Sequence, residues 1–128
     1  MNATLTYSLL ARLLEGSSVI DAGIEDLEEM ELPGITEKGN PTVKVAAGAS
    51  DAEHEIGLVN PLQFLLIVTD QDISVKFSDA ANDAHSIKAR GSGTDKAGIL
   101  FWTSENISSL FFSNAGENPA TVRMFYGA

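Results

Sequence analysis

The two histidines of this 128-residue chain, His54 and His85, are the first candidates for catalytic chemistry. A serine-type triad needs a serine, a histidine and an aspartate that converge in space, but neither histidine lies near a nucleophile-elbow pattern. Two histidines without a fixed spacing make no metal motif, and the chain has no cysteine to add a thiolate. We therefore predict two surface histidines, no catalytic residues, no cofactor and no enzymatic activity.

The acidic loops are candidates for binding calcium. Asp70 and Asp72 in one loop, and Asp79, Asn82 and Asp83 in another, could supply the oxygen ligands that calcium prefers. Neither loop follows the twelve-residue EF-hand pattern. Because aspartate and asparagine also form turns without any ion, we expect turns at both places and no metal site.

The aromatic residues of the second half could bind a sugar. Trp102 beside Phe101, and Tyr126 beside Phe125, are residue types that stack on sugar rings. Each of them lies inside an expected strand rather than on a loop, which favours a buried core or a subunit interface over an exposed platform.

The charge is strongly acidic and unevenly placed. Eighteen acidic residues against eight basic ones give a net charge of −10, which disfavours binding to nucleic acid. Residues 1–60 hold eleven of the acids and three of the bases, and Tyr7 is their one aromatic residue. The densest acidic run, residues 25–31, is either a solvated stretch or a segment that docks on a basic partner surface.

Nothing in the sequence predicts a membrane partner. The longest apolar stretch, residues 62–68, is interrupted by Gln63 and is far shorter than the roughly 20 residues that a bilayer requires. The first residues lack the positive charge of a signal peptide, so we expect synthesis in a cytoplasm.

Short runs of β-branched and aromatic residues separated by turn residues predict a mainly β domain. Strands at this spacing, without intervening helical patterns, indicate an antiparallel β-sandwich or barrel. Asn60-Pro61 marks a break in the pattern, and Ser104-Glu105-Asn106 is one of the expected turns. The expected strands are residues 42–46, 54–59, 63–69, 73–78, 86–90, 98–102, 107–113 and 120–126.

The acidic N-terminal segment, residues 1–32, is ambiguous, and residues 33–128 form the expected β-sandwich domain. Leu5, Tyr7, Leu9 and Leu13 alternate as a strand would, although several leucines also fit a helical stripe. The threonines around Leu5 are poor helix formers, so we favour a strand or an extended arm that carries these four residues.

Three expected strands are apolar on both faces: residues 64–68, 99–102 and 110–112. Since neighbouring side chains of a strand point to opposite sides, a small domain cannot bury all of them. The second face either meets another subunit or is covered by the N-terminal segment of the same chain. The candidate interface residues are Phe64, Leu66, Phe101, Trp102, Phe111, Phe112 and Phe125.

The order and texture of the strands from residue 53 onward resemble small virion proteins of tailed bacteriophages. The resemblance covers residues 53–128 and depends on no invariant motif. It is carried by Glu53-His54-Glu55-Ile56-Gly57-Leu58, by Asn60-Pro61 and the strand ending in Val68-Thr69-Asp70-Gln71-Asp72-Ile73, by Ile107-Ser108-Ser109-Leu110-Phe111-Phe112-Ser113-Asn114, and by the closing strand 120–126.

This resemblance implies a capsid decoration, or cement, protein. Such a protein would be a jelly-roll-like sandwich on the outer capsid surface, bound to the major capsid protein and to copies of itself, often as a trimer. It would be made in the host cytoplasm and located in the virion. The alternatives are a tail-associated module that binds a carbohydrate or receptor, and a head–tail connector or tail subunit. No functional residues carry over from the resemblance.

Overall fold

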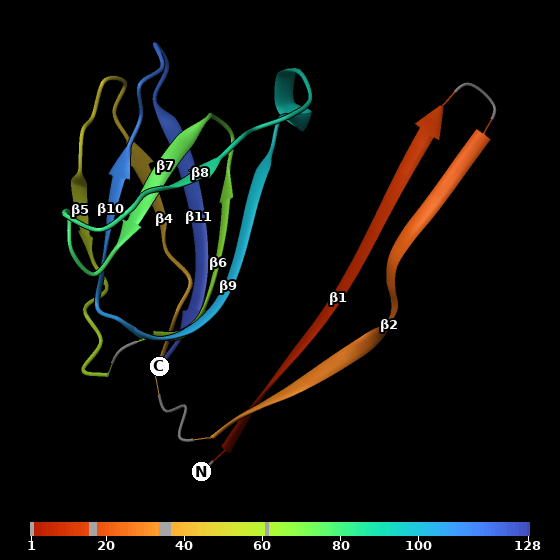
Figure 1. Cartoon of the computed structure of the whole chain (residues 1–128), viewed down its shortest axis with the longest axis horizontal. Helices are drawn as coiled ribbons and strands as arrows, with labels where there is room; N and C mark the ends of the chain where they lie inside the picture. The colour runs from red at the N-terminus through yellow and green to blue at the C-terminus, as the bar shows by residue number, and fades with distance from the viewer. Residues whose placement is uncertain (1, 16–17, 34–36, 61) are drawn as a thin grey trace. The chain divides into compact units, whose positions relative to one another are not determined.

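The computed structural model describes residues 2–15, 18–33, 37–60 and 62–128 (Figure 1). Contacts between Cα atoms divide the chain into two units, Met1–Ile35 and Thr36–Ala128. More than half of the chain is strand, and the described residues contain one short 3₁₀ helix, η1 (Gly93–Asp95), and no α-helix. The prediction of a mainly β, antiparallel protein is confirmed.

The first unit is a long antiparallel hairpin. Strand β1 (Asn2–Glu15) pairs with β2 (Ser18–Pro33), and the register shifts between Tyr7 and Leu9. The structure therefore has the extended form of this segment rather than the helical one. Of the predicted arm residues, Leu5 lies opposite Met30 and Leu13 opposite Ile20.

The second unit consists of two antiparallel sheets. One sheet has the strand order β5–β10–β7–β8, and the other has β3–β11–β6–β9, with β4 also paired to β11. From β4 to β11 the chain crosses between the sheets at every connection except β7–β8, and the resulting strand orders are those of a jelly roll. The strands are β3 (Lys38–Gly39), β4 (Thr42–Val45), β5 (Ala52–Glu55), β6 (Leu62–Thr69), β7 (Ile73–Phe77), β8 (His85–Ile87), β9 (Gly98–Ile107), β10 (Ser109–Ser113) and β11 (Ala120–Gly127).

The two sheets share one hydrophobic core. Alternate residues of each strand point inward, as the period of two requires: Leu65 and Ile67 of β6 are 0% exposed, while Leu66 between them is half-buried. The remaining core residues include Val45, Leu62, Ile73, Val75, Ile87, Ile107, Leu110, Phe112, Ala120, Val122, Met124 and Tyr126. Because these residues come from both sheets, the unit is packed as a β-sandwich.

Several predicted strand boundaries are wrong, and the expected strand 86–90 already ends at Ile87 of β8. The expected turn at Ser104-Glu105-Asn106 lies within β9, because the pairing of β9 with β6 continues to Ile107 opposite Leu62. The expected strand 54–59 ends early, since β5 stops at Glu55. Beyond it, the Glu37 carboxylate accepts hydrogen bonds from the backbone N–H groups of Val59 and Asn60, both at 3.0 Å, and so holds that connection.

Candidate interface on the outer face of a sheet

The outer face of the sheet that contains β11, β6 and β9 carries a continuous group of apolar residues. Leu66 of β6 lies opposite Phe125 of β11 on one side and Phe101 of β9 on the other, and Val68 lies opposite Ile99. Residues that are opposite each other on neighbouring strands share one face of the sheet. We call Leu66, Val68, Ile99, Phe101 and Phe125 the outer patch.

The outer patch faces solvent in the single chain. Ile99 is 66% exposed, Phe101 43% and Phe125 38%. Single exposed apolar residues are common on protein surfaces, but a contiguous group on one sheet face marks an interaction site. The other large exposed hydrophobic residue of the described part of the chain, Val59 at 89%, lies in the connection before β6 and outside the patch.

Phe64 anchors one end of the outer patch. Its ring is nearly buried, at 4% exposure, and lies 5.2 Å from the ring of Phe125 between centroids. The space for it exists because residue 127 is a glycine: a β-carbon there would collide with the Phe64 ring. Phe64 thus lies on the same face as Leu66 and packs its ring against that of Phe125.

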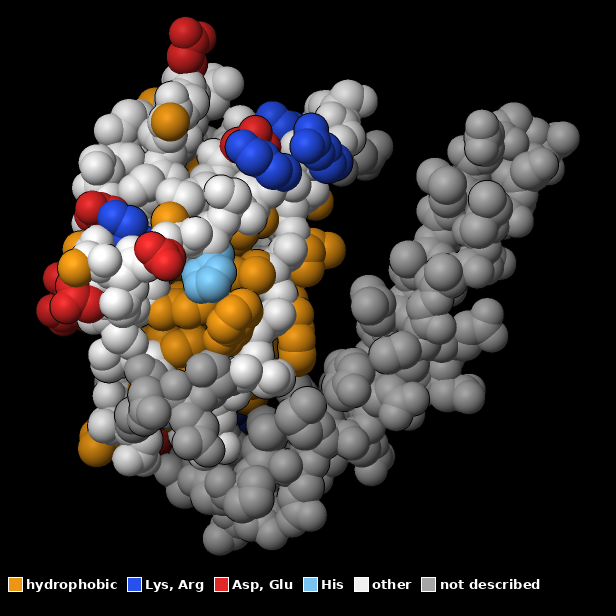
Figure 2. Space-filling model, viewed as in Figure 1, with side chains coloured by type: hydrophobic (Ala, Val, Ile, Leu, Met, Phe, Trp, Pro, Cys, Tyr) orange, Lys and Arg blue, Asp and Glu red, His pale blue; other side chains and the backbone are white. Residues whose placement is uncertain are grey.

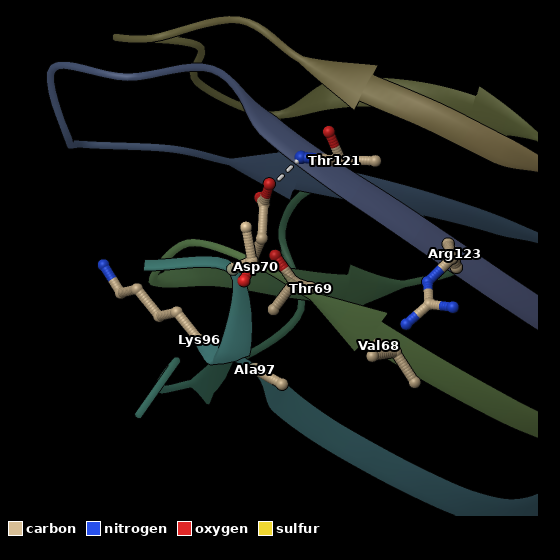
Figure 3. A pocket seen from close by; sticks show the side chains of 8 residues that line it. Val68, Thr69, Asp70, Lys96, Ala97, Thr121 and Arg123 are labelled. Atoms are coloured by element: carbon tan, nitrogen blue, oxygen red, sulfur yellow. Dashed lines mark hydrogen bonds between the residues drawn. The ribbon is translucent and has the colours of Figure 1, made fainter. Parts of the chain in front are cut away.

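Basic residues border the outer patch. Arg123 is exposed and lies opposite Val68, and Lys44 is exposed and lies opposite Thr121 on the same face. Lys96 and Arg123 line a shallow pocket next to Val68 (Figure 3). We call Lys44, Lys96 and Arg123 the basic rim. The one acidic residue lining that pocket, Asp70, directs its carboxylate to the backbone N–H of Thr121 at 2.8 Å.

The predicted interface residues are divided by the structure between the surface and the core. Leu66, Phe101 and Phe125 are in the outer patch, and Phe64 lies buried at one end of it. Phe111 is half-buried on the outer side of β10, in the other sheet. Phe112 is 1% exposed and belongs to the core, so it has no surface for a partner.

Trp102 lies on the inner side of β9 and forms an aromatic cluster with Phe77 and His85. The His85 ring is 4.7 Å from both Phe77, on which it stacks, and Trp102, and the Phe77 and Trp102 rings are 5.4 Å apart. On the surface in view, Figure 2 shows a histidine beside a group of hydrophobic side chains. Tyr126 is 4% exposed and donates to the carbonyl of Ile56 at 3.4 Å, so the residues considered for a sugar platform do not form one surface.

The histidines differ from the predicted surface residues. His85 is half-buried in the aromatic cluster, and His54 is half-buried opposite the core residue Leu110. Burial lowers the pKa of His54 below its ordinary value of 6.5. Within the described part of the chain, Nε2 of His54 is buried without a hydrogen-bond partner, because the alternating strand places the imidazole toward the core.

The acidic loops use their carboxylates to hold backbone. Asp72 accepts from the N–H of Ala89 at 2.9 Å, and Asp79 accepts from the N–H of Ala81 at 2.8 Å. Residues 37–60 and 62–128 contain no group of three histidine, aspartate or glutamate side chains placed to hold a metal ion. The carboxylates of Asp72 and Asp79 thus bind backbone N–H groups, as side chains of turn residues do.

Sequence reasoning missed Val68, Ile99 and Arg123. The alternation of side chains along a strand was enough to find Ile99 and Val68. Ile99 falls on the same side of its strand as Phe101, and Val68 falls on the same side as Phe64 and Leu66. What the sequence did not supply was the pairing of β6 with β11 and β9, which brings these residues together.

Comparison of the chain with models of protein families, with curated proteins and with solved structures finds no significant match. In the described residues no helix has the length and apolar character to cross a membrane.

Proposed function

We propose that this chain is a structural virion protein that binds the outside of a tailed-phage capsid together with copies of itself. The observation that carries the proposal is the outer patch, in which three large apolar side chains stand exposed on one face of a jelly-roll sheet. A subunit that binds a partner needs an apolar face of this kind. A protein that acts as a monomer has no use for apolar side chains exposed to solvent.

The free energy available from the outer patch is sufficient for assembly on a lattice. Full burial of a large apolar side chain contributes about 1.5–3 kcal/mol. Scaled by the exposed fractions of Ile99, Phe101 and Phe125, burial of the patch contributes on the order of 3 kcal/mol per copy. This corresponds to a factor of about 100 in an association constant, and the effect is repeated at every site of a closed shell. Each bound copy thereby adds contacts that the internal pressure of packaged DNA must break.

The test is to image capsids that lack the protein after mixing them with the purified chain. The proposal expects density at regular positions on the outer surface of the shell. Ile99→Asp should reduce the occupancy of these positions, and Val59→Asp, a control at a more exposed position outside the patch, should not. Density at the tail alone would overturn the proposal and favour a tail module. Absence of density from both the shell and the tail would also overturn it.

A further inference from the structure

The edge strand β9 of the second unit lacks the features that usually protect the edge of a sheet. It ends the strand order of its sheet, and within the described part of the chain it pairs with β6 alone (Figure 1). An edge presents backbone N–H and C=O groups to any other extended chain, and natural proteins protect it by shortness, charge, proline or a covering element. Residues 98–103 contain neither a charged residue nor a proline.

The other edges of the two described sheets are protected. β5 has four residues, of which Glu53 and Glu55 are exposed acids. β8 has three residues, and β3 and β4, which both pair with β11, have two and four. β9 has ten. It is therefore the described edge best suited to receive a further strand.

The hydrogen bonds around β9 show which of its backbone groups point to the free edge. Immediately before the strand, Ala97 and Arg90 exchange two backbone N–H···O=C bonds of 2.9 Å. Consecutive residues of a strand direct these groups to opposite edges, so Ile99 and Thr103 direct theirs to the same side as Ala97, away from β6. Met124, whose N–H donates to the carbonyl of the residue before β4, gives the same assignment when the alternation is followed through the registers of β11 with β6 and of β6 with β9.

We infer that β9 of a second copy of this chain pairs antiparallel with this edge. The inference rests on the proposed self-association and names the contact through which it takes place. Because Ala97 is already bonded to Arg90, the new ladder begins at Ile99. Ile99 of each copy then exchanges backbone hydrogen bonds with Thr103 of the other, and the two-fold axis passes through residue 101.

A second copy is the partner that this edge fits, because each copy brings the same unprotected strand and the pairing leaves neither edge exposed. An edge without charge offers nothing that would select a charged partner strand. The two sheets become one, so the outer patches of both copies lie side by side on one continuous face. The contact is isologous and closes at two copies, so it predicts a dimer, whereas the sequence resemblance implies a trimer.

The basic rims stay apart in this dimer. Arg123 lies on β11, so five strand spacings of about 4.8 Å, on the order of 24 Å, separate it from Arg123 of the other copy. Lys96 lies five residues from the axis, which places the two copies of it about 34 Å apart along the strands. Both separations exceed the Debye length of about 8 Å at physiological salt, so repulsion between the rims does not oppose the pairing.

The absence of cysteine from the chain allows a direct test with full-length single-cysteine variants. Phe101→Cys places two thiols opposite each other at the axis, where Cα atoms about 4.5–5.5 Å apart are within reach of a disulfide. Phe125→Cys is the matched control, because Phe125 is similarly exposed in the same patch but lies two strands from the edge. Mild oxidation should give a disulfide-linked dimer of Phe101→Cys in several-fold higher yield. Equal yields, as expected if the patches met face to face, would overturn the inference.

Sedimentation equilibrium of two Thr103 variants supplies a second measurement. Thr103→Pro removes an N–H that points away from β6, so the β6–β9 ladder keeps its bonds while the dimer loses one donor from each copy. Its association should weaken by about tenfold or more. Thr103→Ala removes the same side chain but keeps the N–H, and it should stay within about twofold of wild type. Equal association constants for the two variants would overturn the inference, and the crosslinking comparison tests the pairing without either of them.

The two proposals fail separately. Chains that bind capsids but give no preferential crosslink at residue 101 would retain the proposed function and lose the β9 contact. Chains that crosslink at residue 101 but leave capsids bare would retain the β9 contact and lose the capsid role.

Discussion

Asn114 should be among the most sensitive positions of the second unit, because it joins the two sheets. It follows β10 in one sheet, and its amide nitrogen donates to the carbonyl of Val45, in β4 of the other, at 3.2 Å and to that of Asn118 at 2.8 Å. Its Oδ1 accepts from the N–H of Gly116 at 3.1 Å. The residue is 0% exposed, so water does not replace these partners in the folded state.

Replacement of Asn114 by alanine should destabilise the unit by about 3 kcal/mol. The carbonyl of Val45, a buried residue, loses a donor, which costs about 1–3 kcal/mol. The bonds to Gly116 and Asn118, which are exposed and accessible to water, are worth about 0.5–1.5 kcal/mol each. For a unit of this size, a loss of about 3 kcal/mol lowers Tm by about 12–24 °C.

The stability of this unit can be measured by urea and thermal unfolding. The fluorescence of Trp102 reports on this unit alone, because Trp102 is the single tryptophan of the chain. Asn118→Ala is the matched control, because it retains the backbone carbonyl that Asn114 uses. A loss below about 1 kcal/mol for Asn114→Ala, or equal losses for both variants, would refute the role assigned to the side chain.

Asn114→Asp tests the amide donor alone, because aspartate has nearly the size of asparagine but lacks the NH₂ group. The carboxylate keeps an acceptor for Gly116 but faces the carbonyls of Val45 and Asn118, so the folded state raises the pKa of the new carboxyl group. Stability should then be highest below the unfolded value of about 3.9 and fall as pH rises toward the raised folded pKa. A variant whose stability does not fall over this range would show that the two carbonyls do not constrain the site.

Three further predictions follow from the packing. Gly127→Ala should push the Phe64 ring out of its place and destabilise the unit by about 1–3 kcal/mol, measured by urea unfolding. Because burial lowers the pKa of His54, the folded state binds fewer protons than the unfolded state; stability should be level above pH 6.5 and decrease as pH falls below it, and His54→Leu should remove this decrease. Lys76→Met should cost about 1 kcal/mol in low salt and less in high salt, since the half-buried Lys76 ammonium lies 3.0 Å from Asp51.

The fold class could be predicted from the sequence because apolar and polar residues alternate regularly in some strands. In β7, Ile73 and Val75 alternate with Ser74 and Lys76, and the structure buries the first pair. Such a pattern specifies both the strand and its inner face. The prediction of an antiparallel sandwich follows from several strands of this kind joined by turns.

For a strand that is apolar on both faces, the sequence alone could not show which face points into the core. In β6 both Leu65 and Ile67 on one side and Leu66 and Val68 on the other are apolar, so local pattern favours neither. The choice comes from β11, where Val122 and Met124 are inside and Arg123 lies opposite Val68. Long-range pairing supplied this information, and the same reason explains why the sequence placed Phe112 at an interface.

Charge on the outer face limits how copies of the chain can meet. If two outer patches packed against each other about a two-fold axis, Lys44, Lys96 and Arg123 of one copy would lie near the same residues of the other. Like charges brought together at an interface cost several kcal/mol, whereas elsewhere on the unit Lys76 and Lys88 are matched by Asp51 and Asp72. An apolar patch alone would be compatible with a symmetric dimer. The basic rim around it favours a partner whose surface is acidic around an apolar centre instead.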